Sequence, residues 1–205
     1  MPSLSHFDAA ALYRALLEDI LEQTSRIAPG TIVKCVAVTP PDAVLEFERA
    51  VPEGFRVVPQ EGTGLAERLS NLFVRFIEKE GFERVVVRNS DSPFLGEDYV
   101  LDAFSRLERA GAVFGPDGGG GYNLVGLKAP CPRLFLGIEM STRSVLDETL
   151  VRAAEEGLAC EVLDVGRDVD DPGDLDWLES ELARGPERRE RAPRTAAALA
   201  RLRRG

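Results

Sequence analysis

The sequence has few cysteines and histidines and no long apolar run, and each absence excludes a class of protein. Its three cysteines, Cys35, Cys131 and Cys160, are widely spaced, which excludes a disulfide framework and zinc-type pairs. The only histidine, His6, lies near the N-terminus, so Ser-His or Cys-His nucleophile chemistry is not expected. No membrane span and no signal peptide are expected, because an apolar run of about eighteen residues and a basic leader are both lacking. A cytoplasmic protein is predicted.

The charge of the chain is negative and unevenly distributed. There are 35 acidic residues against 25 basic ones, a net charge of −10. Residues 183–205 contain eight arginines and two glutamates, a charge of +6, which leaves −16 on the rest of the chain. An acidic protein repels a phosphate backbone, so no nucleic-acid partner is expected. We predict one α/β domain over residues 1–182 and a basic C-terminal tail with a short helix over residues 183–205.

Helical and strand patterns alternate along the chain. A capping box at Ser5 precedes a helix predicted to run to Arg26, and Ser141 or Thr142 is the expected cap of a later helix. Further helices are predicted over 43–49, 65–81, 97–110, 143–156, 172–182 and 195–203. Strands are predicted over 31–38, 55–59, 84–88, 112–114, 122–127 and 160–165. This alternation predicts a three-layer α/β fold with a mostly parallel sheet.

The motif Asn89-Ser90-Asp91-Ser92-Pro93 directly follows the strand over 84–88. Open α/β sheets bind ligands at the carboxyl ends of their strands, which is where Asp91 is expected. Two interpretations stay open. Asp91 caps the next helix, as Asp and Ser before Pro commonly do, or it is a ligand of a divalent cation.

A second acidic turn, 168–172, follows the strand over 160–165. Asp170 is the natural partner of Asp91, since two strand-end carboxylates can hold one Mg²⁺ or Mn²⁺ ion and that ion can bind a diphosphate. We expect only one of Asp168 and Asp170 to face the pocket, and Asp174 to face solvent. Helix capping is again the alternative.

Glycine-rich segments occur at two places. The run from Gly115 to Gly121 contains Asp117 and lies between two predicted strands, where glycines let a backbone approach a bound group. A mobile surface loop is the alternative. Gln60-x-Gly62-x-Gly64 is a weaker signal of the same kind, for a base or ribose.

Taken together these segments resemble a bacterial family of GT-A-fold glycosyltransferase-like proteins often encoded beside radical-SAM proteins. That family is distantly related to the molybdopterin-cofactor and phospholactate guanylyltransferases. The matching motifs are Leu12-Tyr13-Arg14-Ala15-Leu16-Leu17-x-Asp19, Gln60-x-Gly62 with Arg68-Leu69, Ser90-Asp91-x-Pro93, Gly115-Pro116, Gly120-Gly121-Tyr122-x-Leu124-x-Gly126-Leu127, Ser141-Thr142 with Val145-Leu146, and Arg167-Asp168-Val169-Asp170-x-Pro172-x-Asp174-Leu175.

The resemblance implies a nucleotide-diphospho-sugar transferase fold and a role for each matching residue. Asp91 and Asp170 would bind the cation and, with Asp117, form the catalytic group. The nucleotide would lie against Gln60, Gly62, Arg68, Ser90 and Pro93. Gly120, Gly121 and Tyr122 would line the side of a small-molecule acceptor.

The chain also departs from the family pattern. Gly119 stands where family members carry an Asp before Gly-Gly-Tyr, and Asp117 could replace that acid only if the loop bends it inward. The family's first strand and basic glycine loop are absent, and we expect a longer reading frame to encode them. Exposed sheet edges would then favour association with a second copy.

Three functions therefore stay open. The first is a cation-dependent transferase using a nucleotide-sugar donor. The second is a nucleotidyltransferase of the guanylyltransferase kind. The third is a non-catalytic remnant of the fold.

Overall fold

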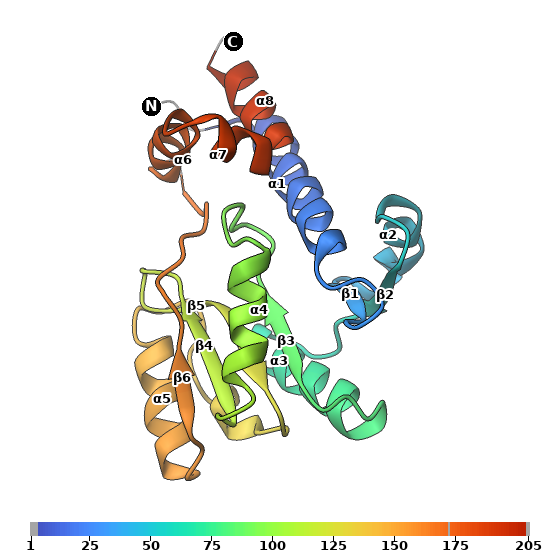
Figure 1. Ribbon diagram of the computed structural model, residues 1–205, viewed down its shortest axis with the longest axis vertical. Helices are drawn as coiled ribbons and strands as arrows, with labels where there is room; N and C mark the ends of the chain where they lie inside the picture. Colours follow the sequence, from blue (N-terminus) through green and yellow to red (C-terminus); the bar gives the residue numbers. More distant parts are fainter. Residues whose placement is uncertain (1–3, 172, 204–205) are drawn as a thin grey trace.

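The structure is a computed structural model, and it describes residues 4–171 and 173–203 (Figure 1). The helices are α1 (His6–Arg26), α2 (Val44–Ala50), α3 (Leu65–Phe73), α4 (Glu97–Arg106), α5 (Val145–Glu155), α6 (Asp174–Ala183), α7 (Pro186–Arg191) and α8 (Pro193–Leu202). A π-helical segment, η2 (Val74–Lys79), extends α3, and single 3₁₀ turns occur at η1 (Pro41–Ala43) and η3 (Pro132–Leu134). The strands are β1 (Lys34–Val38), β2 (Phe55–Pro59), β3 (Val85–Arg88), β4 (Ala112–Pro116), β5 (Tyr122–Leu127) and β6 (Cys160–Val162).

The strands form two sheets, one of four strands and one of two. The larger has the order β3-β5-β4-β6, in which β5 runs antiparallel to both neighbours and β4 pairs with β6 in parallel. Strands β3, β4 and β6 therefore run in the same direction, and their carboxyl ends lie at the same end of the sheet. Strands β1 and β2 form a parallel pair. The predicted α/β fold with a mostly parallel sheet is confirmed.

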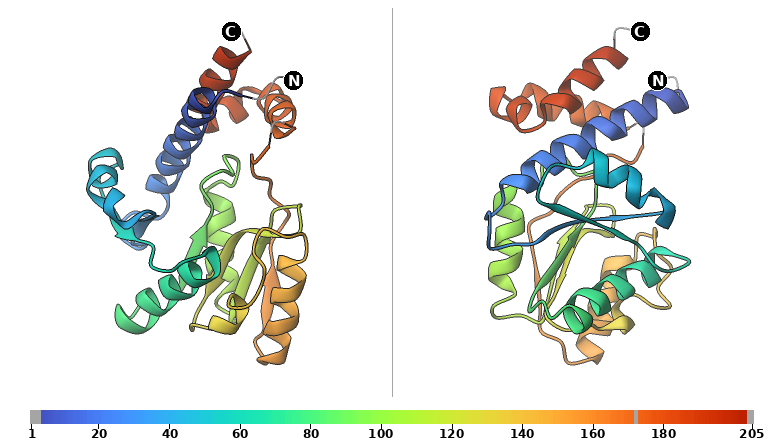
Figure 2. Two further views of the ribbon diagram at one scale, coloured as in Figure 1. Left: turned by 180° about the vertical axis from the view of Figure 1, so that it is seen from behind. Right: turned by 90° about the vertical axis from the view of Figure 1, so that its right-hand side faces the viewer.

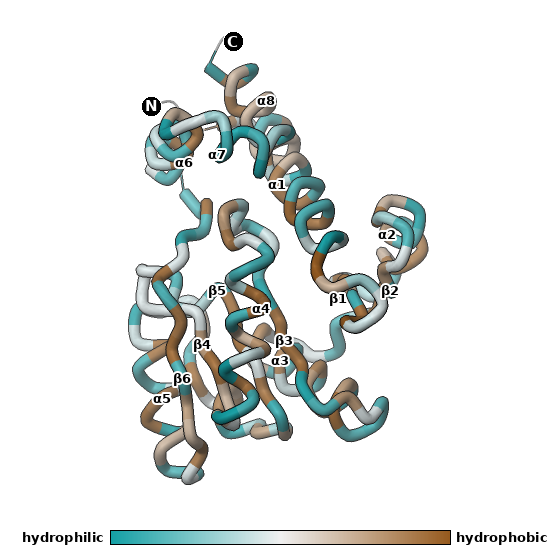
Figure 3. The backbone as a smooth tube through the Cα atoms, viewed as in Figure 1, coloured by the Kyte–Doolittle hydropathy of each residue, from teal (hydrophilic) through white to brown (hydrophobic). Residues whose placement is uncertain are grey.

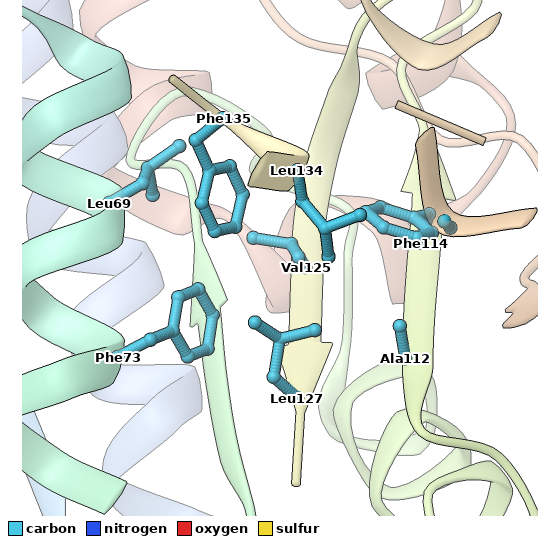
Figure 4. Close-up of a cluster of buried hydrophobic side chains, with 9 residues drawn as sticks. Leu69, Phe73, Ala112, Phe114, Val125, Leu127, Leu134 and Phe135 are labelled. Atoms are coloured by element: carbon cyan, nitrogen blue, oxygen red, sulfur yellow. The ribbon is translucent and has the colours of Figure 1, made fainter. Parts of the chain in front are cut away.

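Helices cover both faces of the four-stranded sheet, because successive apolar residues along its strands point to opposite faces. Ala112 and Phe114 of β4 face a cluster shared with α3, α5 and η3, whereas Val113 between them faces α4. Figure 4 shows the first cluster, in which the rings of Phe73 and Phe135 stack with centroids 5.6 Å apart. This period of two is the pattern of a strand buried on both faces. Figure 3 shows apolar residues concentrated on these strands.

A separate group of helices, α1, α6, α7 and α8, gathers at one end of the molecule (Figures 1 and 2). Its core consists of leucines from three helices: Leu12, Leu16, Leu175, Leu178, Leu182 and Leu199. The buried carboxylate of Asp19 on α1 accepts the backbone N–H groups of Arg194 (3.2 Å) and Thr195 (2.8 Å) at the start of α8. The basic C-terminal segment therefore packs on the body of the protein, and it contains α7 as well as the short helix predicted there.

Most helix boundaries agree with the sequence pattern, and the exceptions have local causes. The hydroxyl of Ser5 accepts the N–H of Asp8 (3.1 Å), which confirms the predicted cap of α1. The prediction that Ser141 or Thr142 caps α5 was wrong: the helix begins after Ser144, and Ser141 has a φ of +68°. The predicted helix start at Pro172 lies outside the described residues, and α6 begins at Asp174. No helix within 4–171 and 173–203 has the length and hydrophobicity that crossing a bilayer requires.

Candidate active site

Four acidic residues follow three strands that end at the same sheet edge. Asp91 comes after β3, Asp117 after β4, and Asp168 and Asp170 follow β6. Backbone hydrogen bonds hold their loops together. The N–H of Val169 donates to the Asp91 carbonyl (3.1 Å), and the N–H of Gly166 donates to the Pro116 carbonyl (2.8 Å). The carboxyl ends of the strands are the usual ligand-binding edge of such a sheet.

A buried arginine shapes the loop that carries Asp91. The guanidinium of Arg88, the last residue of β3, donates to the carbonyl oxygens of Ser92 (2.8 Å), Leu95 (2.9 Å) and Asn89 (3.4 Å). Burial lowers the pKa of Arg88 to about 10, and the nearby Asp91 charge acts in the opposite direction. Arg88 therefore folds the loop around itself and supplies a fixed positive charge beneath Asp91. No local pattern in the sequence marks Arg88 as a residue of the site.

Asp91 lies in an environment that disfavours its own negative charge. Burial, and after it the charges of Asp170 and Asp168, raise its pKa to about 6. Its Oδ1 atom is buried and has no hydrogen-bond partner among the described residues, as is true of Asn89 Oδ1 and Ser92 Oγ in the same loop. Buried polar atoms normally have partners. Three such atoms in one loop leave its hydrogen-bonding capacity unmet by the described residues.

The two acids after β6 share this environment. Burial and the Asp170 charge raise the pKa of Asp168 to about 6, and burial together with the charges of Asp174 and Asp117 raises that of Asp170. The expectation that only one of Asp168 and Asp170 faces the pocket was wrong. Residues two apart in an extended segment fall on the same side, and both carboxylates act on Asp91.

The expectation that Asp174 faces solvent was also wrong. Its carboxylate accepts the backbone N–H groups of Asp170 and Asp171 (3.0 Å each), and Arg167 donates to it (2.9 Å). Asp174 therefore stabilises the turn that presents Asp170. Its role is structural, within the loop.

The acidic group does not by itself supply a full set of metal ligands among the described residues. Within residues 4–171 and 173–203, no set of three or more carboxylate, imidazole or thiol groups is placed to hold a metal ion. Mg²⁺ is commonly held by only one or two carboxylates, with phosphate oxygens and water as its other ligands. The partnerless Asp91 oxygen and the mutually repelling acids fit such a cation.

The glycine loop is held in place by Asp117 and by α5. Asp117 Oδ1 accepts the N–H groups of Gly119 (2.6 Å) and Gly121 (3.0 Å), and its charge raises the pKa of both Asp168 and Asp170. Gly120 has a φ of +103°, and its carbonyl accepts the N–H of Leu146 at the start of α5 (2.9 Å). The loop thus bends Asp117 towards the acids.

The other predicted residues lie at three places. Tyr122 packs into the sheet core, with its ring 5.6 Å from that of Phe114, and burial raises its pKa to about 12. The Ser90 hydroxyl is hydrogen-bonded to that of Tyr13 on α1 (2.6 Å). The carbonyl of Pro93 accepts the side-chain amide of Gln23 (3.0 Å). Only the backbone of Tyr122 borders the glycine loop, whereas Ser90 and Pro93 connect the Asp91 loop to α1.

Gln60, Gly62 and Arg68 form a separate group after β2. The amide of Gln60 donates to the carbonyl of Ala37 on β1 (2.8 Å), and Arg68 Nε donates to the carbonyl of Gly62 (3.3 Å). Gly62 has a φ of +133°, which allows the chain to turn into α3. These contacts organise the loop between β2 and α3.

This arrangement is the fold of nucleotide-diphospho-sugar transferases. A crystal structure from Desulfovibrio desulfuricans G20, proposed to be such a transferase, superimposes with a TM-score of 0.81 at 24% identity. The match covers 97% of this chain and 88% of that one. A structure of CMP:2-keto-3-deoxy-manno-octonic acid synthetase complexed with CTP has a TM-score of 0.53 at 12% identity, covering 82% of this chain and 87% of that one.

The chain belongs to the family described as "Uncharacterized protein conserved in bacteria (DUF2064)", whose model matches residues 24–142. It is also 27% identical over 163 residues to the 2-phospho-L-lactate guanylyltransferase of Methanothermobacter thermautotrophicus. That alignment covers 80% of this chain and 68% of the guanylyltransferase.

Proposed function

We propose that this protein is a cation-dependent transferase that uses a nucleotide-sugar donor. The observation that carries the proposal is the buried, partnerless Oδ1 atom of Asp91, next to the charges of Asp168 and Asp170. Carboxylates that repel one another in a partly dry site are stabilised when a cation joins them. Asp91 and Asp170 would hold Mg²⁺ or Mn²⁺, which would neutralise charge on the leaving diphosphate.

The protein's own residues would orient the reactants. Arg88 fixes the loop that carries Asp91, and Asp174 fixes the turn that carries Asp170. Asp117 holds the glycine loop, whose small residues allow an acceptor to approach closely. Its second carboxylate oxygen could take a proton from that acceptor. Gln60, Gly62 and Arg68 are the proposed contacts of the nucleotide base.

A nucleotidyltransferase is the second candidate, and the 27% identical guanylyltransferase favours it. The same cation site serves both reactions, which differ in the phosphate bond that breaks. A nucleotide-sugar donor loses its sugar, whereas a nucleoside triphosphate loses pyrophosphate. Incubation with labelled UDP-sugar and with GTP, each with Mn²⁺, distinguishes the two products.

Calorimetric titration with nucleotide and Mn²⁺ tests the cation site directly. We expect saturable binding that requires the metal and that is lost in Asp91→Asn and Asp170→Asn. Glu155→Gln is the matched control, since this exposed acid lies at the far end of α5. If the wild-type protein does not bind nucleotide in a metal-dependent manner, it is a non-catalytic member of the fold.

We also propose that the two sheets form one continuous layer in which β1 and β3 are the facing edges. Among the described residues β1 pairs with β2 alone and β3 with β5 alone. Cys35 and Ala37 of β1 and Val85 of β3 contact the same cluster on α3 and η2, which supports one continuous sheet. The two strand edges also support association with a second copy of the chain.

A further inference from the structure

A cavity lies next to the loops that follow β3 and β6. It has a volume of about 660 Å³ and lies between α4, the segment 164–167 and helices α6 and α7. None of Asp91, Asp117, Asp168 and Asp170 lines it. The cavity is therefore distinct from the proposed cation site, although the two sites share the same pair of loops.

Two arginines on α7 form one wall of this cavity. The guanidinium of Arg188 lies over the ring of Phe94, 5.2 Å from its centroid, and its ion pair to Glu181 is long (3.7 Å). That carboxylate is paired more closely with Arg184 (2.7 Å). Packing against an aromatic ring therefore positions Arg188 while leaving its N–H groups available.

Arg191 is one turn further along α7 and is also positioned by packing. Its guanidinium lies against Gly96, where an added Cβ would be 2.8 Å from Nη1. No hydrogen bond or ion pair of this guanidinium occurs among residues 4–171 and 173–203. Arginines with free donors, held side by side, are suited to binding a phosphate or a carboxylate.

The facing wall carries acids that lack partners. The carboxylates of Asp98 on α4 and Asp164 after β6 make no hydrogen bond within the described part of the chain. The other charged lining residues are neutralised by close ion pairs: Arg167 with Asp174, Asp102 with Arg106, and Glu181 with Arg184. Among the described residues the cavity is therefore lined by two arginines and two aspartates that lack close ion pairs. Trp177 also lines it, with the Arg167 guanidinium 4.8 Å from its ring centroid.

We propose that this cavity binds a small hydroxylated anion, such as a phosphorylated or carboxylated polyol. The anionic group would accept hydrogen bonds from Arg188 and Arg191. Hydroxyl groups at the other end would donate to the exposed carboxylates of Asp98 and Asp164 in place of water, and Trp177 would contact the apolar part of the molecule. This binding does not depend on the proposed cation site.

Trp177 is the only tryptophan of the chain, so its fluorescence reports on this cavity. The probe is glucose 6-phosphate, titrated in EDTA, with glucose, inorganic phosphate and γ-aminobutyrate as comparison ligands. We expect a saturable change with glucose 6-phosphate, weaker binding of phosphate and none of glucose. Preference for γ-aminobutyrate, or equal binding of phosphate, would overturn the assignment of a polyol.

Three variants test the arginine wall. Arg188→Gln and Arg191→Gln should each weaken binding about tenfold, because each removes charge-assisted hydrogen bonds. Gly96→Ala should also weaken binding, since it displaces the Arg191 guanidinium without removing a charge.

Two controls separate this site from other effects. Arg201→Gln removes the same charge from an exposed position on α8 and should bind normally. Asp91→Asn should also bind normally, which keeps the result independent of the cation site. Unchanged affinity in Arg188→Gln and Arg191→Gln, or an equal loss in Arg201→Gln, would refute the proposal.

Discussion

Replacing Asp91 with asparagine should stabilise this protein at pH 8 when no divalent cation is present. In the folded state burial and two neighbouring carboxylates oppose the ionised form of Asp91 and raise its pKa from 3.8 to about 6. The unfolded chain has no such opposition. Ionised Asp91 therefore lowers the free energy of unfolding, and a neutral amide of the same shape removes that effect.

The magnitude follows from the pKa shift. A shift of about two units corresponds to about 3 kcal/mol at about 1.4 kcal/mol per unit, once pH exceeds the folded pKa. Since the side chain is partly exposed to water, we expect a gain of about 1–3 kcal/mol. The raised pKa also fixes the direction in which stability changes with pH. An acid with a raised pKa costs nothing below its unfolded pKa and destabilises the fold increasingly as pH rises from about 4 to about 6.

Urea unfolding in EDTA at pH 4, 6 and 8 measures this effect. Asp91→Asn should gain on the wild type as pH rises, whereas Glu155→Gln, an exposed acid in surface ion pairing, should show no such trend. Mn²⁺ should reverse the order by stabilising the wild type alone. If Asp91→Asn is no more stable than the wild type at pH 8 in EDTA, the description of Asp91 as a strained, unpartnered carboxylate is wrong.

Two further predictions concern the loops around the acids. Arg88→Lys should lower the free energy of unfolding by about 2–4 kcal/mol in urea titration, because one ammonium cannot reach the three carbonyls that the guanidinium joins; an unchanged midpoint would contradict this role. Gly120→Ala should destabilise the protein more than Gly157→Ala does. Both glycines have positive φ, but a Cβ at Gly120 would overlap the carbonyl of Arg143, whereas Gly157 faces open space. Equal decreases in melting temperature in the two variants would show that the glycine loop can move to accommodate the added Cβ.

The order of helices and strands was predictable from the sequence because its signals are local. The alternation around Val113 marks a strand buried on both faces, and the Ser5 cap marks the start of α1. That Asp91, Asp117 and Asp170 each follow a strand could also be predicted from the sequence. The start of α5 was not, since two hydroxyl residues before Ser144 gave the same capping signal and the chain passes through a positive φ at Ser141.

Which acids meet, and what surrounds them, depended on contacts between residues far apart in the chain. Local spacing showed carboxylates after three strands, and the sequence pattern alone therefore determined an α/β fold with acids at one sheet edge. The strand order β3-β5-β4-β6 places β3 and β6 at opposite sides of the sheet, and only the path of the segment after β6, past Pro116, brings Val169 against Asp91. Burial of Arg88, and of Tyr122 in the core, likewise arose from packing. The reason is physical: periodicity and turn residues act over a few positions, whereas burial and electrostatic repulsion depend on distances that only the folded chain sets.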